Sequence, residues 1–255
     1  MNIRETTEIL EYYYDKYNNP AFIENDPISI PHSFSTDGDV EISGFLAATI
    51  AWGNRKAIIK SARAMMRLMD DCPFEFITSA SDNDFERLRG FVYRTFNNDD
   101  LFDLCRCLRK MTMEHGSLHG FFASEFAKSN DLRQVLAEFR RQILMPPHNR
   151  HMEKHISSIA KGAACKRLCM YLRWMVRRDK RGVDFGIWNE IPMSALYIPL
   201  DVHSSRVARE LCLLGRKQND WKAVEELTAN LRAIDPSDPV RYDFSLFGAG
   251  VNRGL

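Results

Sequence analysis

Lys166 and Asp201 are the residues whose types and surroundings best fit chemistry on a substrate. A lysine amine acts as a nucleophile only when deprotonated, and nearby positive charge lowers its pKa from the free value of about 10.4. At about 3.6 residues per turn, Arg173 and Arg177 fall on the same side of a helix as Lys166. We therefore predict an outward column of three cations that helps to activate the lysine.

Two interpretations of this column stay open. A row of cations on a helix is most often a solvated surface. Because stacked cations repel one another, they also suit a site where phosphate supplies negative charge. Between positions 161 and 181 there are eight basic residues and one acidic residue, Asp179, although the net charge of the chain is only +1. The basic residues are Lys161, Lys166, Arg167, Arg173, Arg177, Arg178, Lys180 and Arg181.

Asp201 follows Pro199 and Leu200 at the start of a predicted helix. Aspartate is a preferred N-cap residue, and that role alone would explain it. The two roles are compatible, because a helix N-terminus keeps a carboxylate ionised, and an ionised carboxylate can stabilise a developing cation.

Three histidines, His148, His151 and His155, have a spacing that a helix would align. Such a set can bind a metal, but no carboxylate or cysteine of suitable spacing lies beside it in the sequence. We therefore expect a surface or phosphate-contacting patch and no metal or other cofactor.

The elements that must position these residues are helices, because apolar residues recur at helical spacing along most of the chain. A short extended piece is expected at 90–96, and a long loop at 179–200, where length suggests function. Asp39, Asp220 and Asp238 are expected to cap the helices that begin at or after them. The predicted helices span about 5–17, 39–52, 56–69, 101–113, 118–126, 132–144, 163–178, 202–214, 221–233 and 239–247.

Composition and cysteine use indicate a globular, cytoplasmic protein. Hydrophobic residues make up 45% of the chain and charged residues 27%. No apolar stretch is long enough to cross a bilayer, and no secretory signal is visible at the start. The six cysteines lie in apolar helical patterns, so we expect reduced core thiols.

The segment Pro199-Leu200-Asp201-Val202-His203, followed by Arg206-Val207, together with a lysine entering a helix, resembles the helix-hairpin-helix DNA glycosylase superfamily. That superfamily is typified by endonuclease III and the 8-oxoguanine glycosylases. The resemblance implies that Lys166 forms a Schiff base with a sugar and that Asp201 is the catalytic aspartate. No cysteine follows Cys212, so the iron–sulfur motif of many relatives is not expected.

The same resemblance implies a set of DNA-contacting residues. The turn of Lys161 and Gly162 corresponds to the hairpin, and the segment from Gly44 to Asn54 resembles the early helix that approaches the extruded base. Trp52 and Trp188 are candidates for stacking on that base, although such aromatic residues usually belong to the core. The predicted nucleic-acid-binding residues are Asn54, Lys161, Gly162, Arg167, Arg173, Arg177 and His203.

A second resemblance covers nearly the whole chain. The segments Lys166-Arg167-Leu168, Val183 to Trp188 and Tyr242 to Gly248 are similar to an uncharacterised bacterial family, a domain of unknown function related to those glycosylases.

Together these observations predict a single all-α domain, 1–255, with a two-lobed helix-hairpin-helix glycosylase-like fold. One lobe is expected at about 39–178 and the other at about 1–35 with 185–255, with the site in the cleft between them. The predicted function is excision of damaged bases from double-stranded DNA, with strand nicking through Lys166. No membrane and no obligate protein partner is expected. The alternatives are a catalytically inactive nucleic-acid-binding module of the same fold, and a helical scaffold whose cations pair with an acidic protein surface.

Overall fold

The computed structural model describes residues 2–252, and this part of the chain is helical without a β-strand. Single bridges pair Tyr93 with Phe96 and Ala163 with Asp220. The prediction of an all-α protein is therefore confirmed, whereas the extended piece at 90–96 is reduced to the first of these bridges. Among the described residues, no helix combines the length and apolar character needed to cross a membrane.

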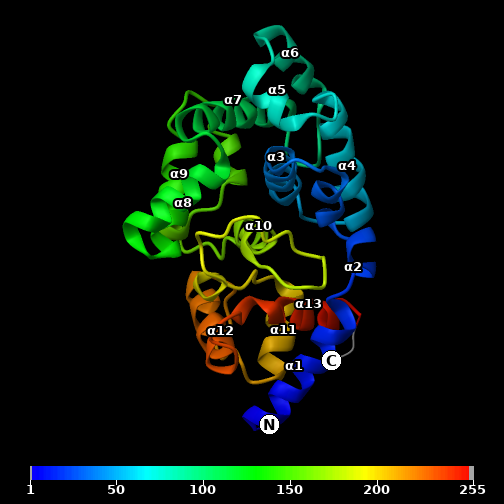
Figure 1. Ribbon diagram of the computed structural model, residues 1–255, viewed down its shortest axis with the longest axis vertical. Helices are drawn as coiled ribbons and strands as arrows, with labels where there is room; N and C mark the ends of the chain where they lie inside the picture. The colour runs from blue at the N-terminus through cyan, green and yellow to red at the C-terminus, as the bar shows by residue number, and fades with distance from the viewer. Residues whose placement is uncertain (1, 253–255) are drawn as a thin grey trace. The chain divides into compact units, whose positions relative to one another are not determined.

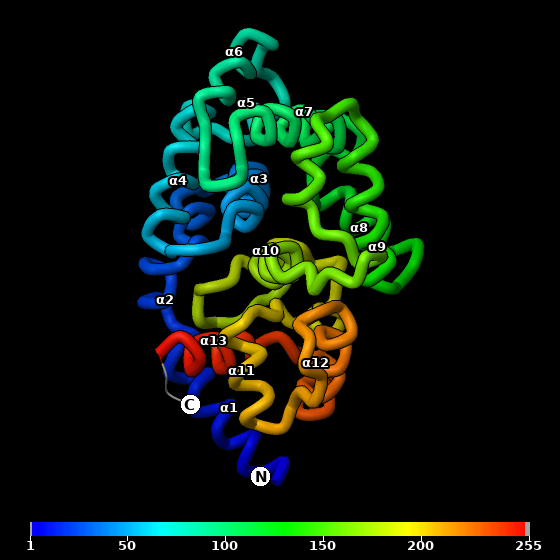
Figure 2. The backbone as a smooth tube through the Cα atoms, turned by 180° about the vertical axis from the view of Figure 1, so that it is seen from behind, coloured from blue at the N-terminus to red at the C-terminus, as the bar shows by residue number. Residues whose placement is uncertain are grey.

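The chain divides into two units, which Figures 1 and 2 show as ribbon and tube. The terminal unit consists of Met1–Glu24 and Ser158–Leu255, and the central unit of Asn25–Ser157. Helix α10 (Lys166–Val176) belongs to the terminal unit, whereas the predicted lobe 39–178 grouped it with the preceding helices. The reason is local: its last carbonyl groups bind the loop that follows it, since Phe185 N–H donates to Trp174 O (2.8 Å) and Trp188 N–H to Met175 O (2.9 Å).

In the central unit, α3 is the most buried helix, with every residue from Val40 to Thr49 inside. It contacts α4, α5 and α8. Thr36 caps α3 in place of the expected Asp39. The elements are η1 (Pro27–Ser29), η2 (Pro31–Ser33), α3 (Asp37–Thr49), α4 (Arg55–Leu68), α5 (Pro73–Ser79), α6 (Asp82–Glu86), η3 (Arg87–Gly90), α7 (Asn98–His115), α8 (Leu118–Ser129), α9 (Leu132–Ile143) and η4 (Met152–His155).

In the terminal unit, α13 packs against both α1 and α11. Two glycines permit this close approach. A Cβ at Gly248 would lie 2.1 Å from a ring carbon of Tyr17, and one at Gly250 would lie 2.8 Å from the His203 carbonyl oxygen. The elements are α1 (Ile3–Tyr17), α2 (Ala21–Glu24), η5 (Ile159–Lys161), α10 (Lys166–Val176), η6 (Met193–Ala195), α11 (Val202–Glu210), α12 (Trp221–Ile234), η7 (Pro239–Tyr242) and α13 (Asp243–Val251).

The long loop predicted between α10 and α11 is confirmed, since its one regular element is the short η6. It is a packed segment rather than an open one. Trp188 is fully buried and its ring meets that of Tyr171 edge to face at 5.5 Å. The prediction that Trp188 stacks on a base is therefore wrong, because the ring is a core side chain.

Cysteine burial follows the sequence expectation only in part. All six thiols are free, but Cys72 and Cys212 are exposed while the other four are buried.

Candidate active site

Lys166 and Asp201, which stand 35 positions apart in the sequence, lie side by side in the terminal unit. The Lys166 Nζ atom is 4.0 Å from Asp201 Oδ2, and the two side chains are 24% and 21% exposed. Lys166 is the first residue of α10, and Asp201 is the N-cap of α11. The two helix starts therefore bring an amine and a carboxylate together where solvent and a ligand can reach both.

The capping role of Asp201 fixes the direction of its carboxylate. Asp201 Oδ1 accepts hydrogen bonds from the backbone N–H groups of His203 (2.9 Å) and Ser204 (3.0 Å). Ser204 Oγ in turn accepts from the Asp201 N–H at 2.9 Å, which completes a capping box. One carboxylate oxygen is thus held by the helix, and Oδ2 is the oxygen that faces Lys166.

Two weakly polar or apolar groups also lie beside the lysine amine. Lys166 Nζ lies 3.2 Å from Met170 Sδ, and 5.9 Å from the centre of the Phe247 ring on α13. The ring of His203 meets Phe247 edge to face at 6.4 Å. The Asp201 carboxylate can accept the proton that a lysine must lose before it acts as a nucleophile.

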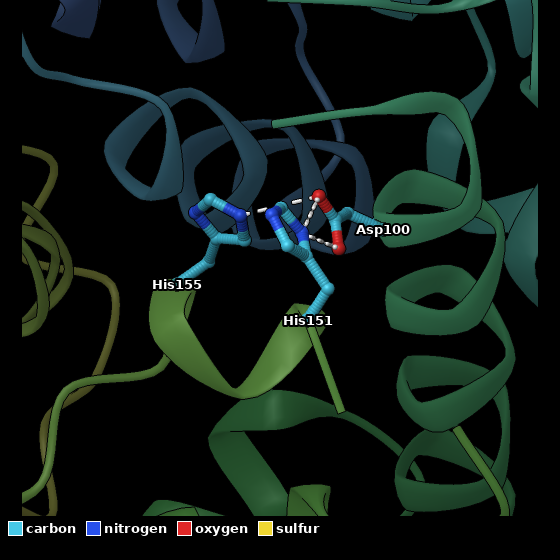
Figure 3. A group of neighbouring side chains, drawn as sticks. All are labelled: Asp100, His151 and His155. Atoms are coloured by element: carbon cyan, nitrogen blue, oxygen red, sulfur yellow. Dashed lines mark hydrogen bonds and ion pairs between the residues drawn. The ribbon is translucent and has the colours of Figure 1, made fainter. Parts of the chain in front are cut away.

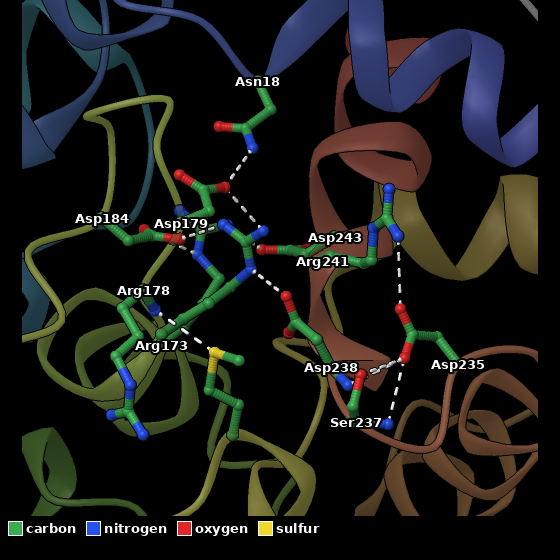
Figure 4. A network of polar contacts seen from close by, with 12 residues as sticks. Asn18, Arg173, Arg178, Asp179, Asp184, Asp235, Ser237, Asp238, Arg241 and Asp243 are labelled. Carbon is green, nitrogen blue, oxygen red and sulfur yellow. Dashed lines mark hydrogen bonds and ion pairs between the residues drawn. The ribbon is translucent and has the colours of Figure 1, made fainter. Parts of the chain in front are cut away.

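The predicted outward column of cations is wrong, because Arg173 and Arg177 are buried, with 3% and 0% of their surfaces exposed. Figure 4 shows the network around them. Arg177 donates to Asp238 (2.9 Å), Asp184 (3.0 Å) and Asp179 (2.8 Å), and also to the Tyr14 hydroxyl (2.8 Å).

Arg173 completes this network from the next turn of α10. Its guanidinium donates to Asp184 Oδ1 at 3.2 Å and to Asp243 Oδ2. Because carboxylates compensate both arginines, neither can contact phosphate or serve as an uncompensated charge beside Lys166. Asp238, which the sequence analysis expected to cap a helix, makes no side-chain cap and pairs with Arg177 instead.

Asp243 is the buried carboxyl group that connects this network to the site. Burial raises the pKa of Asp243 to about 6, against the opposing charges of Arg173 and Lys166, and the charge of Asp201 adds to the increase. In the folded state the Asp243 carboxyl group therefore keeps its proton at pH values at which the same group is already ionised in the unfolded chain.

We therefore expect Asp243 to reduce stability as the pH rises from about 4 to about 6, because the native state then binds more protons than the unfolded state. The free energy of unfolding of the wild type, minus that of Asp243→Asn, should fall by up to about 3 kcal/mol across this window. Urea unfolding of both proteins at several pH values measures this difference. If the free energy of unfolding of the wild type rises with pH relative to that of Asp243→Asn, Arg173 keeps Asp243 ionised across this pH range.

The remaining predicted DNA contacts lie in both units. In the terminal unit, Lys161 and Gly162 are exposed at the turn before α10, where Gly162 has a φ of +78°, and Arg167 is half-buried. His203 is exposed on α11.

Asn54 and Trp52 belong to the central unit. Asn54 is exposed and caps α4 by accepting from Ala57 N–H at 3.2 Å. Trp52 stacks on the ring of His155, with the ring centres 5.6 Å apart.

The histidines do not form the expected surface patch. His155 is 7% exposed, and His151 and His155 both contact Asp100 on α7 (Figure 3). His148 is directed elsewhere, with its Nδ1 atom 2.7 Å from Pro146 O. Sequence reasoning missed Asp100 because it lies 51 positions before His151.

A family model described as "Protein of unknown function (DUF2400)" matches residues 26–252, and the chain therefore belongs to this family. No curated protein and no solved structure matches the chain. The expected membership in a family of unknown function is thus confirmed, whereas the likeness to helix-hairpin-helix glycosylases stays a prediction.

Proposed function

We propose that this DUF2400 protein removes a base from DNA through Lys166 and Asp201. The observation that carries the proposal is the 4.0 Å separation of Lys166 Nζ and Asp201 Oδ2. It supports the proposal because the resemblance to DNA glycosylases assigns the nucleophile and the catalytic aspartate to these two positions, and a shared reaction requires them to be adjacent.

The proposed reaction begins when the Lys166 amine loses a proton, for which Asp201 Oδ2 is the nearest acceptor. The nitrogen lone pair forms a bond to the sugar C1′ while the bond between C1′ and the base breaks. The base leaves with that electron pair and takes up the proton that Asp201 accepted, so that Asp201 is ionised again. The nitrogen now bonded to C1′ loses a proton to solvent and its lone pair forms the C1′=N double bond. The ring oxygen leaves C1′ and takes up a proton from solvent, which gives the open-chain Schiff base. Ionised Asp201 stabilises the positive charge that develops on the sugar as the base leaves.

The entrance to α10 supports nucleic-acid binding beside this site. Gly162 adopts a left-handed conformation, and no side chain caps the N-terminus of α10. The N–H groups of a first helical turn attract phosphate, and the exposed Lys161 adds positive charge four positions before the N-cap residue, Cys165. In this proposal the phosphate contact comes from this turn and not from Arg173 and Arg177.

A base-release assay with Asp201→Asn tests the proposal. Asparagine still caps a helix, so the fold should be retained while the negative charge is lost. We expect base release from duplexes carrying 8-oxoguanine or uracil to slow by about 100- to 1,000-fold, the usual effect of removing one electrostatic contact to the transition state. Asp131→Asn is the matched control, because Asp131 caps α9 in the central unit. Equal rates in both variants would exclude Asp201 from the reaction.

The alternative is a nucleic-acid-binding module without catalysis, and one observation favours it. Lys166 forms an ion pair with Asp201, and an ion-paired ammonium is not a nucleophile. A module of this kind would bind duplexes in a salt-dependent way and release no base from any of them. The assay above separates the two functions.

A further inference from the structure

The central unit contains a cluster of one carboxylate and two imidazoles, shown in Figure 3. His151 Nδ1 lies 2.9 Å from Asp100 Oδ1 and 2.8 Å from Oδ2, and His155 Nε2 lies 3.2 Å from Oδ2. One ligand atom from each residue lies within 4.8 Å of the others. The three side chains therefore converge on one point from two separate segments, α7 and the turn that contains η4.

The charge of Asp100 requires a positive partner. Its side chain has no exposed surface, and a buried carboxylate is costly unless a cation compensates it. Within residues 2–252, the ion-pair partners of Asp100 are the two histidines. With neutral imidazoles, its charge would be offset only by the Asn97 N–H group and by the N-terminus of α7. The charge of Asp100 can be balanced by a proton on one imidazole or by a metal ion bound between the three side chains.

We propose that Asp100, His151 and His155 bind a divalent transition-metal ion, with zinc as the preferred ion. Two nitrogens and one carboxylate oxygen form a common zinc ligand set. In a tetrahedral site with bonds of about 2.0 Å, neighbouring ligand atoms lie about 3.3 Å apart. The two histidine–Asp100 contacts at 2.8 and 3.2 Å need to open by only a few tenths of an ångström to reach that spacing. The two histidine nitrogens, which lie within 4.8 Å of each other, must reach it as well.

The residues around the cluster hold two of the ligands in place. Asn97 N–H donates to Asp100 Oδ2 at 2.8 Å, which orients the carboxylate. The His155 ring lies between Trp52, stacked at 5.6 Å, and Phe96, which meets it edge to face at 4.7 Å. Such outer contacts are typical of metal sites, in which they fix the ring orientation and raise affinity.

The third ligand leaves the site accessible. The side chain of His151 is 31% exposed, whereas those of Asp100 and His155 are 0% and 5% exposed. With three protein ligands, a tetrahedral ion keeps one position for water or another small ligand. The ion would also tie the turn at 151–155 to the first turn of α7.

Cobalt and zinc titrations of the chelator-treated full chain test this site. We expect one equivalent of Co²⁺ to give the visible absorption of a tetrahedral ion with nitrogen and oxygen ligands and no thiolate charge-transfer band, and Zn²⁺ to displace it. His151→Ala should weaken Zn²⁺ binding by more than about 100-fold, beyond the effect of losing an outer contact. His148→Ala is the matched control and should bind as the wild type does, because that histidine lies on the same segment outside the cluster.

Three results would overturn the proposal. One is a wild type that binds no stoichiometric metal, which would mean that a proton compensates Asp100. Another is a thiolate band, which would assign the metal to cysteines such as the exposed Cys72 or Cys212. The third is an equal loss of affinity in the His148 and His151 variants. The wild-type spectrum distinguishes nitrogen and oxygen ligands from thiolates, so this part of the test does not depend on the folding of a variant.

Discussion

Replacing Arg177 by alanine is expected to lower the free energy of unfolding by about 3–5 kcal/mol, the usual result of removing one partner from a buried ion pair. The side chain is fully buried and donates to three carboxylates and to the Tyr14 hydroxyl. The Asp184 and Asp238 side chains lose a cationic partner in the variant while remaining largely buried. Urea unfolding followed by circular dichroism measures the change.

Arg178→Ala is the control for this experiment, because Arg178 is the next residue along the chain and is exposed. Its effect should stay within about 0.5 kcal/mol, as for most surface substitutions. A small effect of Arg177→Ala on stability, combined with a loss of DNA binding, would restore the interpretation of Arg177 as a phosphate contact.

The helices of this chain could largely be predicted from apolar periodicity, because most of the longer ones bury one stripe of side chains, although α3 and α10 are buried on more than one side. The extents of α9 and α12 agree with prediction to within a residue. The short helices α5 and α6 could not be predicted, since seven and five residues are too few to display a helical period. Asp220 was predicted as an N-cap and is one, accepting from Ala223 N–H at 3.1 Å.

The two faces of α10 show where sequence reasoning failed. Periodicity places Arg173 and Arg177 opposite the leucine face, but it cannot tell what covers that side. The cover comes from distant carboxylates, Asp184 on the long loop and Asp243 at the start of α13. A helix whose charged face is buried by ion pairs has the same residue pattern as a helix whose charged face is exposed to solvent.

The pairing of Lys166 with Asp201 was predictable only through the resemblance to glycosylases. Helical periodicity does not relate positions that lie 35 residues apart. The glycosylase motif does, because it implies that the lysine and the aspartate are adjacent in the folded chain. The cluster of Asp100 with His151 and His155 lacked such a guide. Its histidines were visible from their spacing, but the carboxylate that joins them stands on another helix.

The role of Lys166 as a nucleophile is the central claim, and a covalent adduct would report it directly. A Schiff base between the amine and the sugar C1′ accepts hydride from borohydride and becomes a stable secondary amine. Lys166→Gln removes the amine and should abolish the adduct completely. Lys222→Gln is the matched control, because Lys222 is an exposed lysine on α12 of the same unit, outside the proposed site, and should still permit trapping.

The most direct measurement is therefore borohydride trapping of the wild-type protein on duplexes carrying an abasic site, 8-oxoguanine or uracil, followed by peptide mass spectrometry. We predict that the trapped sugar is attached to Lys166, that Lys222→Gln forms the same adduct and that Lys166→Gln forms none. An adduct on another lysine, or one that persists in Lys166→Gln, would contradict the assignment. A wild type that binds these duplexes but forms no adduct and releases no base would identify the protein as a binding module.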